Sequence, residues 1–95
     1  MEKDKTRFWL KLADTFELPE EILVDFPCIF TVGTQKFYVL NHKGLLEYQN
    51  RKIGLRMKGG KIVLEGKNFL IEEIDREQII VSGNITLISF GGGEI

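Results

Sequence analysis

Four carboxylates close together are the first residues of this chain whose type and spacing could do chemistry. Glu72, Glu73, Asp75 and Glu77 form a short acidic run. Paired carboxylates can bind a divalent cation or share the acid and base roles of a glycosidase. This run, however, follows the end of an apolar, strand-like stretch and enters a turn, where solvated charges are expected. We therefore expect surface carboxylates and no metal site.

The single histidine and the single cysteine also lack partners for chemistry. His42 lies in the turn-like segment Asn41-His42-Lys43-Gly44, and no Asp, Glu or Cys stands near it at metal-ligand spacing. Cys28 follows Pro27 at the head of an apolar run, whereas a nucleophilic thiol needs an electropositive, partly exposed setting. We expect a polar turn residue and a buried structural thiol. The sequence therefore predicts no enzyme and no cofactor.

Basic residues gather in the middle of the chain. Arg56, Lys58 and Lys61 surround a Gly-Gly pair, with further Lys and Arg on either side. Such a cluster can meet anionic lipid, nucleic acid or an acidic protein surface, although cations on an edge hairpin also prevent aggregation without any ligand. The whole chain has 13 Lys and Arg against 14 Asp and Glu, a balance that argues against a nucleic-acid binder. We take the three named cations as candidate contacts with a partner or a membrane.

Residues 5–16 predict a short amphipathic helix. Phe8, Leu12 and Phe16 recur every four residues, with Trp9 beside them. Aromatic residues among Lys and Arg are typical of a helix that lies on a membrane, but the same stripe could contact a partner or close an open sheet face. We favour the last reading and keep the other two open. The candidate contacts on this helix are Phe8, Trp9, Leu12 and Phe16.

After a second short helical signal at 19–24, the chain predicts only strands. The strand-like runs lie at 28–32, 36–40, 45–48, 53–58, 61–65, 69–74, 78–82 and 84–90. Runs of this length between polar or glycine turns favour an antiparallel meander of about eight short strands. The expected turn glycines are Gly33, Gly44, Gly59 and Gly60, of which the last two should form the centre of a tight hairpin. We expect a helical segment at 1–26, a β domain at 27–90 and a flexible tail at 91–95.

The last strands repeat one phrase. IVLEGKNFLI at 62–71 aligns with IIVSGNITLI at 79–88, and Gly66 then falls on Gly83. A glycine at the same place in both copies predicts two equivalent bends, because a corner needs a residue without a Cβ. Both faces of the strands are partly apolar, so we expect a small sandwich or barrel-like sheet, or a face covered by the N-terminal helix or a partner. A short β-solenoid is the alternative, although two copies are few for one.

Four phrases in a fixed order carry a resemblance to a known family. They are LPEEILVDFPCIFTVG (18–33), NHKGLLEY (41–48), KIVLEGKNFLIEEI (61–74) and EQIIVSGNITLISF (77–90). With these phrases the chain resembles the YabP/YqfC family of sporulation proteins of spore-forming Firmicutes, and within it the YqfC branch. The resemblance implies a small non-enzymatic protein, made in the mother cell during endospore formation, that works with a membrane-bound partner of the YqfD type. It brings no catalytic residue or cofactor.

The expected function is therefore that of a structural or adaptor protein that acts through its surface. No signal peptide and no apolar span of about 20 residues is visible, so we expect the mother-cell cytoplasm, with possible peripheral contact at the forespore membrane. Replacing Phe8 and Trp9 by Ala should then abolish association and leave the domain folded.

Two other functions stay open. One is a β-rich scaffold whose copies pair through strand edges as homo-oligomers. The other is a small RNA-binding barrel that combines the basic hairpin with Phe37, Tyr38 and Tyr48 as stacking platforms, although no nucleic-acid partner is expected from the charge balance.

Overall fold

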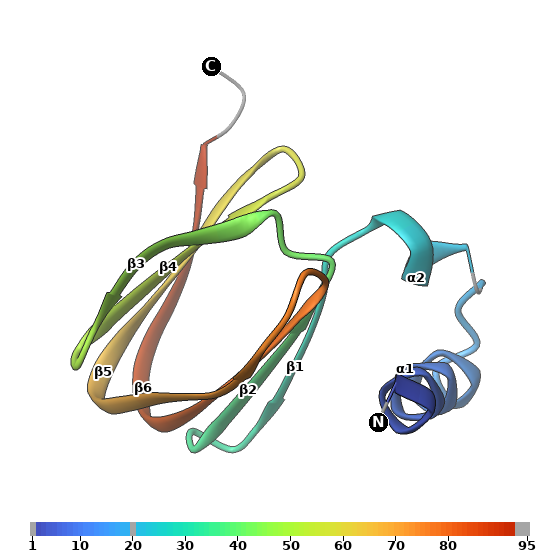
Figure 1. The fold of residues 1–95 in the computed structure, drawn as a ribbon, viewed down its shortest axis with the longest axis horizontal. Coiled ribbons are helices and arrows are strands. Elements are labelled where there is room, and N and C mark those ends of the chain that lie inside the picture. Colours follow the sequence, from blue (N-terminus) through green and yellow to red (C-terminus); the bar gives the residue numbers. More distant parts are fainter. Residues whose placement is uncertain (1, 20, 93–95) are drawn as a thin grey trace.

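Two short helices precede a sheet of six antiparallel strands (Figure 1). The structure is a computed structural model and describes residues 2–19 and 21–92. The helices are α1 (Glu2–Thr15) and α2 (Ile22–Asp25). The strands are β1 (Cys28–Val32), β2 (Lys36–Leu40), β3 (Gly44–Gln49), β4 (Lys52–Met57), β5 (Gly60–Ile74) and β6 (Gln78–Gly92). The expected all-β architecture with N-terminal helices is confirmed.

The strand count was predicted too high, because two pairs of predicted strands are continuous. The runs at 61–65 and 69–74 both belong to β5, and those at 78–82 and 84–90 both belong to β6, so each strand has 15 residues. Gly66 and Gly83 bend these strands without ending them, and the pairing of β5 with β6 continues on both sides of the bend. β6 also runs to Gly92, inside the predicted tail; residues 93–95 lie outside the described part.

The bends fold the sheet over on itself (Figure 1). The strand order is β1-β2-β6-β5-β4-β3, and the sheet is not closed into a barrel. One layer contains β1, β2, the first half of β6 and the second half of β5; we call it the helix-covered layer. The other contains β3, β4, the first half of β5 and the second half of β6; we call it the uncovered layer. The core between them consists of Phe37, Val39, Ile53, Leu55, Met57, Ile62, Leu64, Phe69, Ile79, Val81 and Ile85.

The repeated phrase relates the two layers. The β1–β2 hairpin pairs with the start of β6, just as the β3–β4 hairpin pairs with the start of β5. Ile62 and its counterpart Ile79 are both fully buried, as are Leu64 and Val81. The repeat therefore marks two bent strands that occupy equivalent places in a folded-over sheet, which was the favoured reading, and not the coils of a solenoid.

At each bend, backbone amides of the bent strand donate hydrogen bonds to a neighbouring hairpin turn. In β6, the Gly83 amide donates to the Gln35 carbonyl at 3.1 Å and the Ile85 amide donates to Thr34 at 2.8 Å. In β5, the Gly66 amide donates in the same way to the Arg51 carbonyl at 3.0 Å. These bonds satisfy backbone groups that leave the regular ladder at the corner.

Helix α1 covers the outer face of the layer that contains β1 and β2 (Figure 1). Trp9 is 4% exposed, and its Nε1 donates to Oε1 of the buried Gln78 at 2.8 Å. The Phe8 ring lies 5.8 Å from Phe30 and 5.3 Å from Tyr38, centre to centre. In this layer, the second apolar face predicted from the strands is thus covered from within the chain, whereas the outer face of the uncovered layer is not covered by either described helix.

The tight hairpin between β4 and β5 is displaced by one residue from its predicted position. Met57 pairs with Gly60, so the two central residues are Lys58 and Gly59. Gly59 has φ 85°, a left-handed conformation that glycine adopts without strain, while Gly60 opens β5. Gly33 and Gly44 also have positive φ at the predicted turns.

Candidate interaction surface

The predicted contact residues of α1 lie in different environments. Trp9 is buried against the sheet, and Phe8 and Leu12 are half-buried. Phe16 follows the end of α1 and is 64% exposed. Of this group, Phe16 is therefore the side chain that another molecule can reach directly. A contact through Trp9 would require α1 to leave the sheet.

Phe16 is one of several exposed apolar side chains in the segment after α1, which the sequence did not single out. The segment between α1 and β1 carries four large apolar side chains that remain in solvent. They are Phe16, Leu18, Val24 and Phe26, with exposed fractions of 64, 44, 79 and 51%; we call them the linker patch. Single exposed apolar residues are normal, but four within eleven residues are typical of a contact site.

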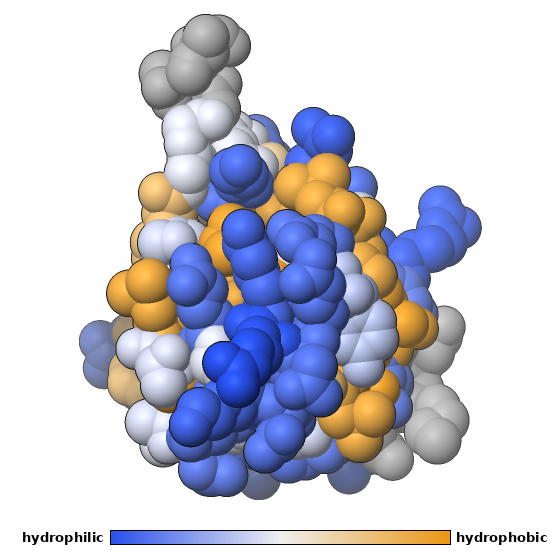
Figure 2. All heavy atoms as spheres, turned by 90° about the vertical axis from the view of Figure 1, so that its left-hand side faces the viewer, coloured by the Kyte–Doolittle hydropathy of each residue, from blue (hydrophilic) through white to orange (hydrophobic). Residues whose placement is uncertain are grey.

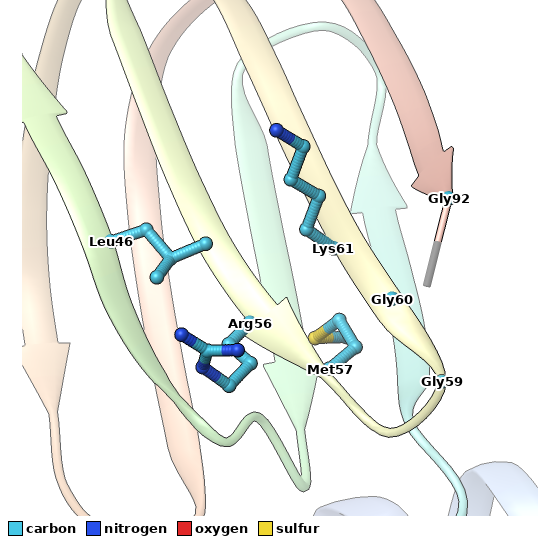
Figure 3. A pocket seen from close by; sticks show the side chains of 7 residues that line it. All are labelled: Leu46, Arg56, Met57, Gly59, Gly60, Lys61 and Gly92. Carbon is cyan, nitrogen blue, oxygen red and sulfur yellow. The ribbon is translucent and has the colours of Figure 1, made fainter. Parts of the chain in front are cut away.

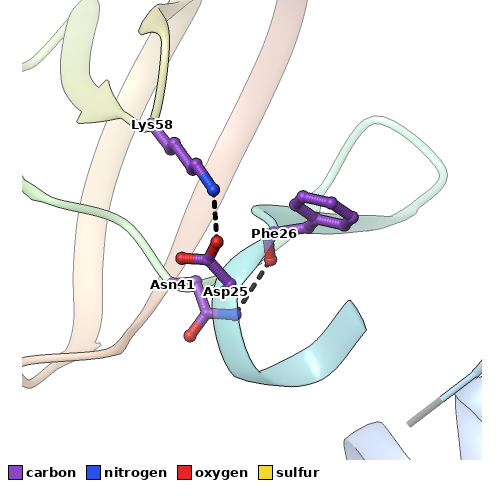
Figure 4. Close-up of polar contacts among 4 residues, drawn as sticks. All are labelled: Asp25, Phe26, Asn41 and Lys58. Atoms are coloured by element: carbon purple, nitrogen blue, oxygen red, sulfur yellow. Dashed lines mark hydrogen bonds and ion pairs between the residues drawn. The ribbon is translucent and has the colours of Figure 1, made fainter. Parts of the chain in front are cut away.

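Lys58 joins the linker patch to the β4–β5 turn (Figure 4). Its Nζ donates to the Asp25 carboxylate, and the same Nζ lies 5.3 Å from the centre of the Phe26 ring. The hydrogen bond to Lys58 holds the pKa of Asp25 below its usual value. Asn41 Nδ2 adds a bond of 2.9 Å to the Phe26 carbonyl. The structure thus brings one of the predicted basic residues against the helical segment, although more than thirty positions separate them.

Arg56 and Lys61 lie on the outer face of the uncovered layer. They are register partners on β4 and β5, and neither has an ion pair with a described residue. Both line a shallow pocket of about 290 Å³ (Figure 3). Its other lining residues are Leu46, Met57, Gly59, Gly60 and Gly92. Figure 2 shows the centre of this face as hydrophilic, with apolar side chains at its margins. Arg56 and Lys61 therefore remain available to bind an anionic group, whereas Lys58 is already paired with Asp25.

The acidic run at the β5–β6 turn is used within the fold. Asp75 Oδ1 accepts the amides of Glu77 and Gln78 at 2.9 and 2.8 Å, which closes the turn. Glu72 accepts from Lys36 Nζ at 2.6 Å across the sheet. No group of three or more His, Cys, Asp or Glu in the described ranges could hold a metal ion.

The Lys36–Glu72 pair predicts how the stability of the folded protein changes at acidic pH. The hydrogen bond from Lys36, and then one from Ser82, lowers the pKa of Glu72 in the folded protein. Folding therefore favours the ionised carboxylate, so the stabilisation is present above about pH 4.3 and is lost as the pH falls through the folded pKa. The Glu72→Gln variant should lose less stability than the parent protein on acidification below that value. Urea titrations at several pH values would check this, and identical acid-side slopes would contradict it.

His42 lies between β2 and β3 in the predicted turn segment, and its side chain is buried. It is 7% exposed, and its ring connects the β2–β3 and β5–β6 turns. The Gly44 amide donates to Nδ1 at 3.1 Å, which leaves the proton on Nε2 to donate to the Asp75 carbonyl at 2.8 Å. Its role here is structural.

Cys28, which was predicted to be a buried structural thiol, is half-buried, and burial raises the pKa of its thiol above the usual value.

The aromatic residues proposed as base-stacking platforms do not form an exposed row. Phe37 is fully buried in the core, and Tyr38 packs against Phe8. Tyr48, at 46% exposure, accepts a weak bond of 3.4 Å from the Ile71 amide. This arrangement gives no support to the RNA-binding alternative, which needs successive accessible rings.

Comparison with known proteins decides the family. The family model described as the YabP family matches residues 29–95. The chain belongs to the YabP family. It is also 34% identical over 88 residues to the uncharacterized protein YqfC of Bacillus subtilis (strain 168), a match that covers 93% of this chain and 92% of YqfC. The resemblance to the YqfC branch is thereby confirmed.

The two matches differ in how much of this YabP-family chain they cover. The family model begins at Ile29, inside β1, and so matches the folded sheet. The similarity to YqfC leaves only about seven of the 95 residues outside, so it includes the linker patch. Neither helix in the described part of the chain is long and apolar enough to cross a membrane.

Proposed function

We propose that this YabP-family protein is a non-enzymatic adaptor of endospore formation that acts in the mother cell through contact with a membrane-bound partner of the YqfD type. The observation that carries the proposal is the similarity to YqfC over 93% of the chain, with a family match over residues 29–95. Several described residues add support, because their polar groups serve the fold: His42 and Asp75 close turns, and Glu72 pairs with Lys36.

The linker patch is the surface that we assign to the partner. Its four side chains would be stabilised by leaving water, because burial of a large apolar side chain contributes roughly 1.5–3 kcal/mol. Lys58 and Asn41 anchor the segment at Phe26, so part of the patch is ordered before binding, which lowers the entropy lost on association. Arg56 and Lys61 provide cations for acidic groups of the partner or of the membrane surface beside it.

Co-purification of a tagged chain from sporulating cells tests the assignment. The double variant Phe16→Ser/Val24→Ser should recover at least about tenfold less of the membrane-bound partner than the parent chain, because two exposed anchors are removed. Its circular dichroism should not change, since both side chains lie mostly in solvent.

The matched control is Val32→Ser/Leu70→Ser, which removes two side chains of 50 and 57% exposure from the sheet. This control should retain the partner. Equal recovery by both double variants would rule out the linker patch as the contact surface. Normal yields of heat-resistant spores from cells that lack the gene would rule out the sporulation function itself.

A further inference from the structure

The second half of β6 is an edge of the sheet with one unpaired side. From Leu87 to Gly92 it pairs with β5, and no other described strand lies beside it. An edge of this kind presents a row of backbone donors and acceptors to solvent, and it can pair with a further strand. Six residues are enough for a stable addition, since typical strands have about five or six.

This edge lacks the features that normally prevent pairing. Residues 86–92, TLISFGG, contain no charge and no proline. By contrast, β3 carries Glu47, and the edge half of β5 carries Glu72 and Glu73. β1 is uncharged too, but it is shorter and starts directly after Pro27.

The edge also exposes large apolar side chains on both of its faces. Leu87 is 50% exposed on the outer face of the sheet, and Phe90 is 73% exposed on the face that continues into the core. Phe90 is paired in register with Ile62, which is fully buried, so Phe90 marks the point where the core reaches solvent. An added strand would cover both side chains.

We propose that the occupant of this edge is the same strand of a second copy, in antiparallel pairing across a two-fold axis through Ser89. In this register Ser89 faces Ser89, Ile88 faces Phe90, and Leu87 faces Gly91. Each Phe90 thereby gains an aliphatic neighbour, and glycine leaves room for each Leu87. No like charges meet, because the segment has none. A strand from another protein would need an aliphatic residue opposite Phe90 and a small residue opposite Leu87. A second copy of this chain has both.

Two charged residues on the neighbouring strand β5, Lys61 and Glu65, are compatible with this pairing. The Lys61 side chain lies over Gly91, where a Cβ would be 3.0 Å from Lys61 Cε. Leu87 is in register with Glu65. Since Gly91 faces the second copy's Leu87, each Lys61 lies in the same cross-strand row as the other copy's Glu65. A two-fold pairing closes the assembly at a dimer, whereas head-to-tail pairing of edges would continue into fibres.

Sedimentation velocity of the full chain and of charge variants at Ser89 tests the proposal. The parent chain should show a concentration-dependent equilibrium between monomer and dimer. Ser89→Lys and Ser89→Glu each place two like charges opposite each other, so each variant alone should dimerise about fivefold or more weakly. An equal mixture of the two variants should form a heterodimer at least about tenfold tighter than either homodimer. Ser89 is exposed, so the monomer should fold in both variants.

Thr31→Lys is the matched control, because it adds the same charge to an exposed position on β1. It should dimerise like the parent chain. A parent chain that stays monomeric at high concentration, or that forms an open-ended series of larger species, overturns the proposal. So does a mixture of the Lys and Glu variants that associates no better than each variant alone.

Discussion

Replacing Gly66 by Ala should lower the free energy of unfolding by about 3 kcal/mol or more, and should shift the midpoint of urea denaturation accordingly. A Cβ built on Gly66 would lie 2.0 Å from the carbonyl oxygen of Asn84 and 3.0 Å from the Phe69 ring. The carbonyl belongs to the backbone of the paired strand, so the clash cannot be relieved by rotation of a side chain. The corner of β5 would have to open, and the core beside Phe69 with it.

The counterpart Gly83 should respond in the same way. Its Cβ would lie 2.7 Å from Phe69 Cδ1, and its φ of 146° is one that other residues rarely adopt. Gly54→Ala is the control, because a Cβ there meets nothing closer than 3.7 Å. It should leave stability unchanged or raise it by up to about 1 kcal/mol. Equal effects of Gly66→Ala and Gly54→Ala would contradict the close-packed corner.

Trp9→Ala should have a comparable effect, with a loss of about 3 kcal/mol, because it removes the largest side chain that holds α1 on the sheet. The change also takes the Nε1 donor from Gln78, whose Nε2 already lacks a hydrogen-bond partner within the described ranges. An unpaired buried amide adds to the penalty. Hydrogen exchange should become faster throughout α1, while amides of the central strands stay protected.

Lys11→Ala is the control for this helix, since Lys11 is exposed, and it should leave stability within about 0.5 kcal/mol of the parent value. Unchanged exchange in α1 of the Trp9→Ala variant would show that the helix is not held by this side chain. Trp9 is also the single tryptophan of the chain, so its fluorescence reports the position of α1. Binding through the linker patch should leave that emission unchanged, whereas binding through Trp9 itself should change it.

The candidate surface could be predicted only in part. Phe16 and Lys58 were identified from helical spacing and from the clustering of cations, and the structure places both at or against the linker patch. Val24 and Phe26 were not identified, because apolar residues in a segment without periodicity give no sign of whether the fold covers them. Trp9 was identified for its type, but its burial depends on Gln78, 69 positions later.

The sequence by itself determined the class of fold and the family. Short β-rich runs with turn glycines gave an all-β chain, and the phrase repeated at 62–71 and 79–88 gave two equivalent bends. Those features are local, and they depend on the conformational preferences of single residues and on spacing along the chain.

Only the tertiary structure decided how many strands there are, what covers each face and which polar residues serve the fold. Gly66 could have ended a strand or bent it, since glycine is common both in turns and at bends, and the choice depends on the Asn84 backbone that lies across from it. The sequence identifies His42 as a polar turn residue, but its burial depends on the β5–β6 turn, which brings the Asp75 carbonyl to its ring. These outcomes depend on contacts between distant residues, which are absent from any local pattern and form only when the sheet folds over.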